Sequence, residues 1–217
     1  MKRSLVYLMA WVGCLCCFTN CQQVIKSQAA LYKWVHNADN GLIKKKTVGQ
    51  VKLSMKYLPP ELLVSKELRG KYKNRKVVDS LLAQYKNGRT FLLNLTLSSE
   101  GDKASVQDIL YKDANSYSAY KQRAMEMNFN MAQYIRLKAG NKVMKPVIAN
   151  MENTYSLTKG RNIYLVFSGD EASKRALKKA KKLDITFTDQ LFETGIHHFV
   201  FNTNDLDNIP QVSYLHK

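Results

Sequence analysis

The stretch Val51-Lys52-Leu53-Ser54-Met55-Lys56-Tyr57 decides the fold class, because its apolar and polar residues alternate without a break. A period of two is typical of a β-strand that buries one face. Pro59 and Pro60 end the strand, since proline donates no hydrogen bond to a ladder. We expect residues 42–48 to pair with this strand, which places a hairpin early in the domain.

Further strands are predicted along the rest of the chain. Residues 90–98 (TFLLNLTLS) are apolar enough for a central strand. Phe129, Met131, Ile135 and Leu137 have even spacing, which predicts a strand that residues 139–141 end. The remainder indicates a β-meander over residues 143–150, 162–168, 183–188 and 196–201.

Helical spacing of apolar residues predicts helices over residues 27–36, 74–85 and 116–127. Another helix is expected from Asp170 and Glu171 through Lys182, because acids favour the N-terminal end of a helix dipole and lysines the other end. The elements together predict an α+β fold, mainly β, with an Ig-like or related β-sandwich and helical insertions. No linker or internal repeat divides it, so residues 27–217 are expected to form a single domain.

The first 20 residues are expected to form a signal peptide. Lys2 and Arg3 precede an uncharged apolar run at residues 5–18 (LVYLMAWVGCLCCF). An apolar run of this length suits a signal peptide, whereas a bilayer span needs about 20 apolar residues. Export is therefore expected, and a membrane-spanning anchor is the less favoured alternative.

The four cysteines, Cys14, Cys16, Cys17 and Cys21, all precede the expected domain, so no disulfide is expected in it. Phe18-Thr19-Asn20-Cys21 resembles the relaxed lipobox of bacterial lipoproteins, especially those of the Bacteroidota, in which the cysteine carries a diacylglycerol. The resemblance implies lipidation at Cys21 and a lipid-anchored tether over residues 21–26. Asn20 departs from the preferred Gly or Ala, Cys16 or Cys17 can compete, and a soluble secreted protein is the alternative.

Scattered positions extend the resemblance over most of the mature chain: Trp34, Asn40-Gly41-Leu42, Tyr57-Leu58-Pro59-Pro60-Glu61, Ile185, Phe187, Asp189, Gly195, Phe199, Phe201, Asp205-Leu206 and Pro210. The chain is similar to a group of uncharacterised Bacteroidota lipoproteins. This likeness implies no known activity and no catalytic residue. Residues 22–26 (QQVIK) lack the acidic cluster of surface-exported lipoproteins, which favours an outer-membrane lipoprotein facing the periplasm.

The chain is strongly basic, with 34 Lys and Arg against 17 Asp and Glu and a formal net charge of +17. Basic clusters occur at residues 44–46, 66–76 and 174–182, and they favour anionic partners. The third cluster carries six cations that we expect to contact such a partner: Lys174, Arg175, Lys178, Lys179, Lys181 and Lys182. Ala176, Leu177, Ala180 and Leu183 form a thin apolar stripe, so the alternative is that this stripe packs on the domain while the lysines only face water.

No motif for nucleophilic, metal-dependent, phosphate-binding or dinucleotide chemistry occurs, so we expect no enzyme, no cofactor and no metal. His197 and His198 are adjacent on a predicted strand and therefore point to opposite faces. Residues 202–208 (NTNDLDN) lack the register of an EF-hand, which favours a turn over a calcium site. Asp184 and Asp189 suggest acid–base chemistry by composition alone.

One modification motif is present. Asp79-Ser80-Leu81 resembles the O-glycosylation motif of Bacteroidota periplasmic proteins, which implies modification at Ser80.

The expected function is a non-catalytic binding or assembly module, held at a membrane by its N-terminal lipid and paired with an envelope protein. The alternative is an electrostatic binder of anionic polymer, nucleic acid or glycan, through the lysine-rich patches. Nucleic acid is less favoured because the clusters contain little Arg and few aromatic residues. A hydrolase is the least favoured function.

Overall fold

The computed structural model describes residues 24–69, 74–98, 107–153 and 159–216. The expected signal peptide and Cys21 lie outside the described residues. The strands are β1 (Val24–Ile25), β2 (Ile43–Val48), β3 (Val51–Leu58), β4 (Arg89–Leu97), β5 (Ile135–Ala139), β6 (Lys142–Met144), β7 (Ile148–Met151), β8 (Arg161–Phe167), β9 (Lys182–Asp189), β10 (Gly195–Asn202) and β11 (Gln211–Val212).

The α-helices are α2 (Gln28–His36), α3 (Pro60–Leu68), α4 (Arg75–Lys86), α5 (Tyr117–Met125), α6 (Glu171–Lys179) and α7 (Thr203–Asp207). Short 3₁₀ segments are η1 (Ala38–Asn40), η2 (Ile109–Tyr111), η4 (Met131–Gln133) and η5 (Ser213–His216), and η3 (Glu126–Asn130) is a π-helix. No helix among the described residues is long and apolar enough to cross a bilayer.

A five-stranded antiparallel sheet has the order β2-β3-β4-β8-β7. The alternation of apolar and polar residues along β3 matches the burial of their side chains. The apolar residues Val51, Leu53, Met55 and Tyr57 are buried, whereas Lys52 is exposed. The predicted hairpin with β2 is confirmed. The predicted central place of residues 90–98 is also confirmed, since β4 lies between β3 and β8.

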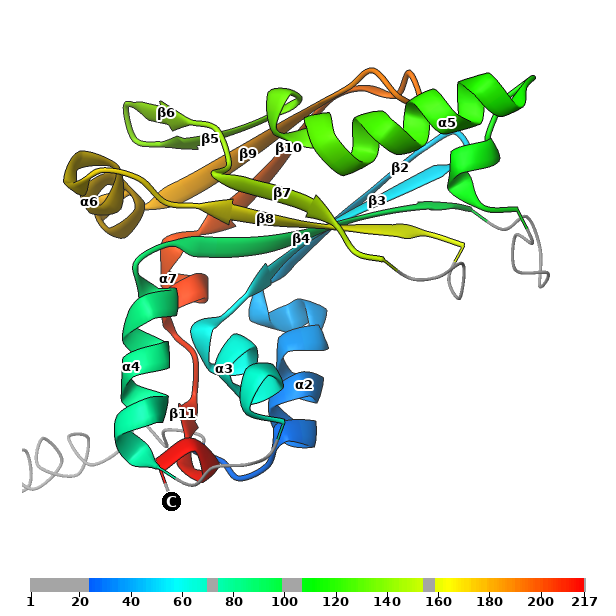
Figure 1. Cartoon of the computed structure of the whole chain (residues 1–217). Helices are drawn as coiled ribbons and strands as arrows, with labels where there is room; N and C mark the ends of the chain where they lie inside the picture. The colour runs from blue at the N-terminus through cyan, green and yellow to red at the C-terminus, as the bar shows by residue number, and fades with distance from the viewer. Residues whose placement is uncertain (1–23, 70–73, 99–106, 154–158, 217) are drawn as a thin grey trace, which may run out of the picture.

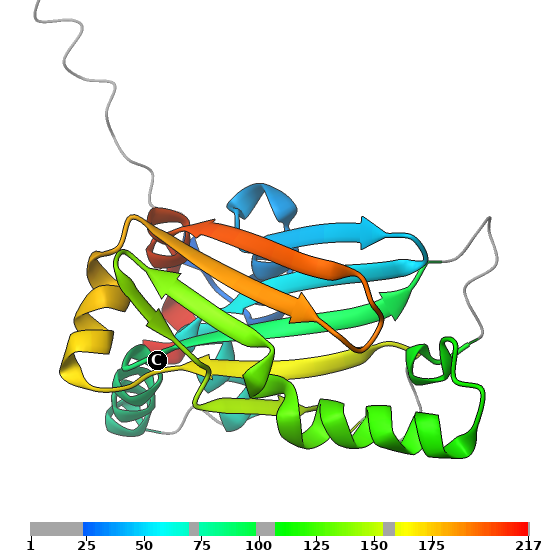
Figure 2. The same cartoon turned by 90° about the horizontal axis from the view of Figure 1, so that it is seen from above.

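A four-stranded antiparallel sheet, β10-β9-β5-β6, lies over one face of the larger sheet (Figures 1 and 2). The ring of Phe91 on β4 joins the two sheets, because its centroid lies 5.1 Å from that of Phe201 on β10. Within the five-stranded sheet, the same ring lies 6.0 Å from that of Phe167 on β8. Ring pairs at this spacing pack favourably beyond their buried area. The buried residues form one cluster that runs from Ile25 to Leu215.

The predicted meander is wrong in its connections. β8 belongs to the five-stranded sheet, whereas β9 and β10 pair in the four-stranded sheet. Residues 143–150 are not one strand, because β6 and β7 belong to different sheets and buried Pro146, which donates no ladder hydrogen bond, lies between them.

The predicted strand at Phe129–Leu137 is wrong in its first half. α5 continues into η3 and η4, and β5 begins only at Ile135. Helical spacing explains this, since Met127 and Met131 are four residues apart and both are fully buried. Phe129, which set the even spacing, is 77% exposed.

Helices α2, α3 and α4 gather at one end of the five-stranded sheet, beside the parallel pair β1–β11 and the C-terminal η5 (Figure 1). The side chains of Ser27 and Asn74 cap α2 and α4, as Ser and Asn commonly do. Helix α3 was not expected, although Pro60 at its first position is a usual helix start.

The mixture of helices and several antiparallel sheets confirms the α+β part of the predicted fold class. The strand orders give no support to the Ig-like topology.

Candidate functional site

A cleft of about 580 Å³ is lined by residues of β3, α3, the α4–β4 turn, α6 and the end of α7. Four cationic side chains from three segments line it, namely Lys86, Arg89, Lys174 and Lys178. Two acids, Glu61 and Asp207, line it as well. The cationic side chains therefore outnumber the acidic ones.

Arg89 connects two walls of the cleft. Its Nη1 donates to the Tyr57 hydroxyl at 3.0 Å, and its Nη2 donates to Oδ1 of Asp207 at 2.6 Å. Burial works against the charge of Arg89, but the Tyr57 hydroxyl and Asp207 outweigh it and raise the Arg89 pKa. The guanidinium therefore stays charged and fixed in orientation.

Gly88 lets the α4–β4 turn approach the end of β8. A Cβ atom at Gly88 would lie 2.7 Å from the carbonyl oxygen of Phe167. The Ser168 hydroxyl donates to the Asn87 carbonyl oxygen across the same junction at 3.2 Å. This close approach positions Arg89 at the edge of the cleft.

Tyr57 is buried beside the cleft and is one of its lining residues, and its ring packs on Phe91, with centroids 5.3 Å apart. Burial raises the Tyr57 pKa, and the neighbouring Arg89 opposes that rise only in part. The hydroxyl is therefore protonated at neutral pH and can donate a hydrogen bond.

Glu61 and Lys86 close one side of the cleft. Lys86 Nζ at the end of α4 lies 3.8 Å from Oε1 of Glu61 in the first turn of α3. The Oε2 atom of Glu61 is buried and has no hydrogen-bond partner among the described residues. Such an atom raises the cost of burying the carboxylate, which the nearby lysine offsets.

The third basic cluster divides between the cleft and the outer surface. Lys174 and Lys178 are one helical turn apart on α6 and line the cleft on either side of buried Leu177. Lys174 also pairs with exposed Glu171 at 2.8 Å. Arg175 and Lys179 lie on the same helix but do not line the cleft.

Helix α6 does not extend through Lys182, contrary to the expectation. It ends at Lys179, where Ala180 takes an extended backbone conformation, and Lys182 begins β9. Thr203 holds the residues that follow the helix in place, since its hydroxyl donates to the Ala180 carbonyl and its N–H donates to the carbonyl oxygen of Lys181 at 3.0 Å. Leu183 is consequently a buried strand residue, and the stripe of α6 packs on the domain through Leu177, Ala176 and Ala180.

The other two basic clusters do not form single patches. Lys44 and Lys46 on β2 lie over the rings of Phe201 and Phe199 at 5.7 and 5.8 Å, whereas Lys45 alternates to the opposite face. The cluster at residues 66–76 is divided between α3 and α4, and residues 70–73 lie outside the described part of the chain.

The predicted opposite orientations of His197 and His198 are confirmed. His197 is buried and its Nε2 lies 2.8 Å from the Thr194 hydroxyl, while exposed His198 contacts Asp184 at 2.9 Å. Asp189 is structural: its carboxylate accepts from the backbone N–H groups of Leu191, Phe192 and Thr194 at 2.9, 3.1 and 3.2 Å. Neither Asp184 nor Asp189 lines the cleft.

The oxygen-rich segment 202–208 forms the short helix α7 rather than a turn. The carboxylate of Asp207 accepts a hydrogen bond from Arg89, and that of Asp205 accepts one from Nδ2 of Asn202 at 3.2 Å. Within the described ranges, no three His, Cys, Asp or Glu side chains lie close enough to hold a metal ion. Ser80 is exposed on α4, so its modification stays a prediction.

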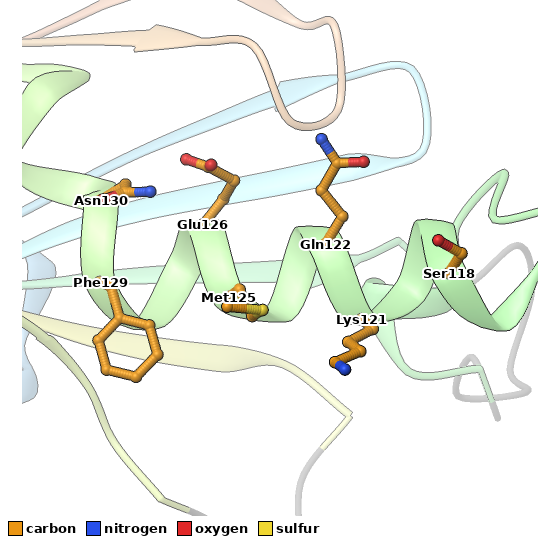
Figure 3. A pocket seen from close by; sticks show the side chains of 7 residues that line it. All are labelled: Ser118, Lys121, Gln122, Met125, Glu126, Phe129 and Asn130. Carbon is orange, nitrogen blue, oxygen red and sulfur yellow. The ribbon is translucent and has the colours of Figure 1, made fainter.

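Another hollow runs along α5 and η3 (Figure 3). Figure 3 shows Ser118, Gln122 and Glu126 along one row and Lys121, Met125 and Phe129 along another. One lysine and one glutamate line it, so it lacks the cationic cluster of the cleft.

Sequence reasoning missed Tyr57, Glu61, Lys86, Arg89 and Asp207. Their segments come together only through the fold, and no local spacing identifies them as a group. Tyr57 and Glu61 do belong to the stretch on which the likeness to Bacteroidota lipoproteins rests, and that likeness stays a prediction.

Comparisons with known proteins give little guidance. No model of a protein family matches the chain, and no curated protein matches it. One solved structure that it resembles is a novel protein of unknown function from Burkholderia pseudomallei K96243, with 12% identity and a TM-score of 0.38. That match covers 83% of this chain and 86% of the other.

Proposed function

We propose that this protein is a non-catalytic binding module of the bacterial envelope that takes an acidic segment of a partner protein in the cleft defined by Lys86, Arg89, Lys174 and Lys178. The convergence of these four cations on one cleft carries the proposal. Lys86 and Arg89 have carboxylate partners within the cleft, whereas the ion-pair partner of Lys174 in the described part of the chain is the exposed Glu171. Lys178 has no ion pair among the described residues, so an incoming carboxylate meets the strongest attraction on the α6 side.

The module is proposed to be tethered by a lipid on Cys21 to the outer membrane, facing the periplasm. The apolar run before Cys21 and the lipobox-like order of residues 18–21 support this tether. The contact between Phe91 and Phe201 supports the further proposal that the two facing sheets form a β-sandwich that holds the cleft rigid.

The runner-up is binding of an anionic polymer, either glycan or nucleic acid. The exposed cations Arg175, Lys179, Lys181 and Lys182 favour it, because they lie outside the cleft and extend the basic surface. An anionic polymer would contact these residues as much as the cleft, whereas an acidic segment would contact mainly the cleft. Substitutions at the two sets of cations therefore distinguish the two functions.

The test uses a chain beginning at Gln22, which retains every buried core residue from Ile25 to Leu215. A fluorescent hexaglutamate peptide is titrated at low salt against two double variants with the same charge change. Lys174→Gln/Lys178→Gln removes the cleft lysines, and Arg175→Gln/Lys179→Gln removes their neighbours on the same helix.

The cleft variant is expected to bind about tenfold more weakly, and the matched control less than about twofold. Equal losses in the two variants would favour the polymer binder, and an unchanged cleft variant would contradict the proposal.

A further inference from the structure

A groove of about 290 Å³ lies on the face of the five-stranded sheet that turns away from the four-stranded sheet. Helices α2 and α3 lie beside this face (Figure 1) and contribute to its wall. Three polar residues form a cross-strand row on its floor, since Ser54 pairs with Asn94 and Asn94 with Asn162. The groove is therefore a built polar surface, separate from the basic cleft.

One end of the groove is cationic. Nζ of Lys56 lies 2.6 Å from Nε2 of His36, and Nδ1 of His36 lies 2.8 Å from the carbonyl oxygen of Tyr32. Both contacts are satisfied when Nδ1 carries the imidazole proton and Nε2 accepts from the ammonium. His36 is then neutral, and the positive charge of the pair belongs to Lys56.

Lys66 on α3 adds a second ammonium to this end. Burial lowers the pKa of Lys56, and the charges of Lys66 and Lys45 lower it further. Among the described residues, neither Lys56 nor Lys66 has a carboxylate within ion-pair distance. An anion placed between Lys56 and Lys66 would relieve the repulsion between their two ammonium groups.

The other end offers groups that suit hydroxyls. Nδ2 of Asn94 donates to Oδ1 of Asn162 at 2.8 Å, and Nδ2 of Asn162 donates to Oε2 of Glu152 at 2.7 Å. Burial raises the pKa of Tyr164, and the charge of Glu152 and its hydrogen bond with Tyr164 raise it further. The Glu152 carboxylate repels a second anionic group at this end and attracts hydroxyl donors.

We propose that this groove binds a sugar carrying one anionic group, with the anion at Lys56 and Lys66 and the hydroxyls along Asn94, Asn162 and Glu152. Leu58, Leu62 and Leu92 line the groove, and Leu92, which is only partly buried, supplies an apolar surface for the C–H face of the sugar. A volume of about 290 Å³ lies at the small end of ligand sites, which fits one sugar unit rather than a polymer. A carboxylate and a phosphate share this chemistry.

The test titrates the ¹⁵N-labelled chain beginning at Gln22 with glucuronate, glucose 6-phosphate and glucose, and follows the ring nitrogens of His36. Saturable shifts with either anionic sugar support the proposal, and the sugar that binds more tightly identifies the anion. Glucose binding as tightly as both anionic sugars would overturn the anion subsite. Acetate or inorganic phosphate binding as tightly as the sugars would overturn the hydroxyl subsite, and absence of any binding would overturn the whole.

Two variants locate the binding. Lys56→Met is expected to weaken binding of the anionic sugar about tenfold, whereas Lys52→Met, on the same strand but outside the groove, changes it less than about twofold. If Lys56→Met does not fold, Lys66→Gln on the surface of α3 replaces it, with an expected loss of about threefold. Unchanged affinity in the folded variant would overturn the assignment.

Discussion

Nη2 of Arg89 at the start of β4 lies 2.6 Å from Oδ1 of Asp207 at the end of α7, so this ion pair joins two elements far apart in the chain. The Arg89 side chain is mostly buried, whereas that of Asp207 is half exposed. The exposure of this ion pair to solvent is therefore intermediate between that of a surface pair and that of a buried pair. The pair fixes one wall of the cleft.

The first prediction concerns that pair. Arg89→Met removes the hydrogen bonds to Asp207 and to the Tyr57 hydroxyl and is expected to lower the free energy of unfolding by about 2 kcal/mol. Urea unfolding monitored by circular dichroism measures the loss. The control is Arg75→Gln, which breaks the exposed pair with Asp79 and is expected to cost at most about 0.5 kcal/mol. Similar losses in both variants would show that Arg89 is an ordinary surface cation.

The second prediction tests the packing between the sheets. Phe91→Ala is expected to cost about 3–5 kcal/mol, because the ring is fully buried against Tyr57, Phe167 and Phe201. The same substitution at Phe129, which is 77% exposed, is expected to cost less than about 1 kcal/mol. Thermal unfolding of the two variants compares them. A mild effect at Phe91 would contradict a core shared by both sheets.

The period-two strands and the capped helices could be predicted because their signals are local. Alternation along β3 and the caps at Ser27 and Asn74 each lie within a few residues of the element that they define. The choice of sheet could not be predicted, because β8 and β9 are consecutive strands, yet β8 pairs with β4 and β9 with β5, and both of these partners are distant in sequence. The strand predicted from Phe129 was wrong for a similar reason. The even spacing assumed that Phe129 is buried, but burial depends on tertiary contacts.

The candidate site was predictable only on α6. Lys174 and Lys178 were among the six cations selected from the sequence, and the amphipathic pattern places them on one helical face. Arg89 and Asp207 are separated by 118 positions, so only the fold brings them together. Lys181 and Lys182 were selected with the helix but lie beyond its end, because β9 takes Leu183 into the core.

The third prediction is a loss of stability in acid. Burial lowers the pKa of His197, and Lys46 lowers it further against the opposing effect of Asp189. The pKa of His36 is lowered chiefly by burial as well. Both residues bind protons more weakly in the folded chain, so the free energy of unfolding falls as the pH drops below about 6.5, the ordinary histidine value.

Urea midpoints measured between about pH 5 and pH 7.5 check this slope. His197→Gln should flatten part of it and leave the contribution of His36, whereas His198→Gln, on the exposed face of the same strand, should leave the His197 contribution in place. Stability that rises on acidification through this window would contradict the assignment of both histidines as neutral in the folded chain.

The fourth prediction is lipidation at Cys21. In a bacterial host labelled with palmitate, the wild-type chain is expected to carry label and Cys21→Ser to carry none. Cys16→Ser and Cys17→Ser serve as controls and should keep the label. Label retained by Cys21→Ser would assign the lipid to another residue.

The most direct test of the central claim, a basic cleft that receives an acidic partner segment, is a map of backbone amide shifts in the ¹⁵N-labelled chain as hexaglutamate is added at low salt. The proposal predicts saturable shifts confined to the elements around the cleft, at Tyr57, Glu61, Gly88, Leu177 and Asp207. Shifts spread evenly over Lys44–Lys46 and Lys179–Lys182, or no shifts at all, would contradict it.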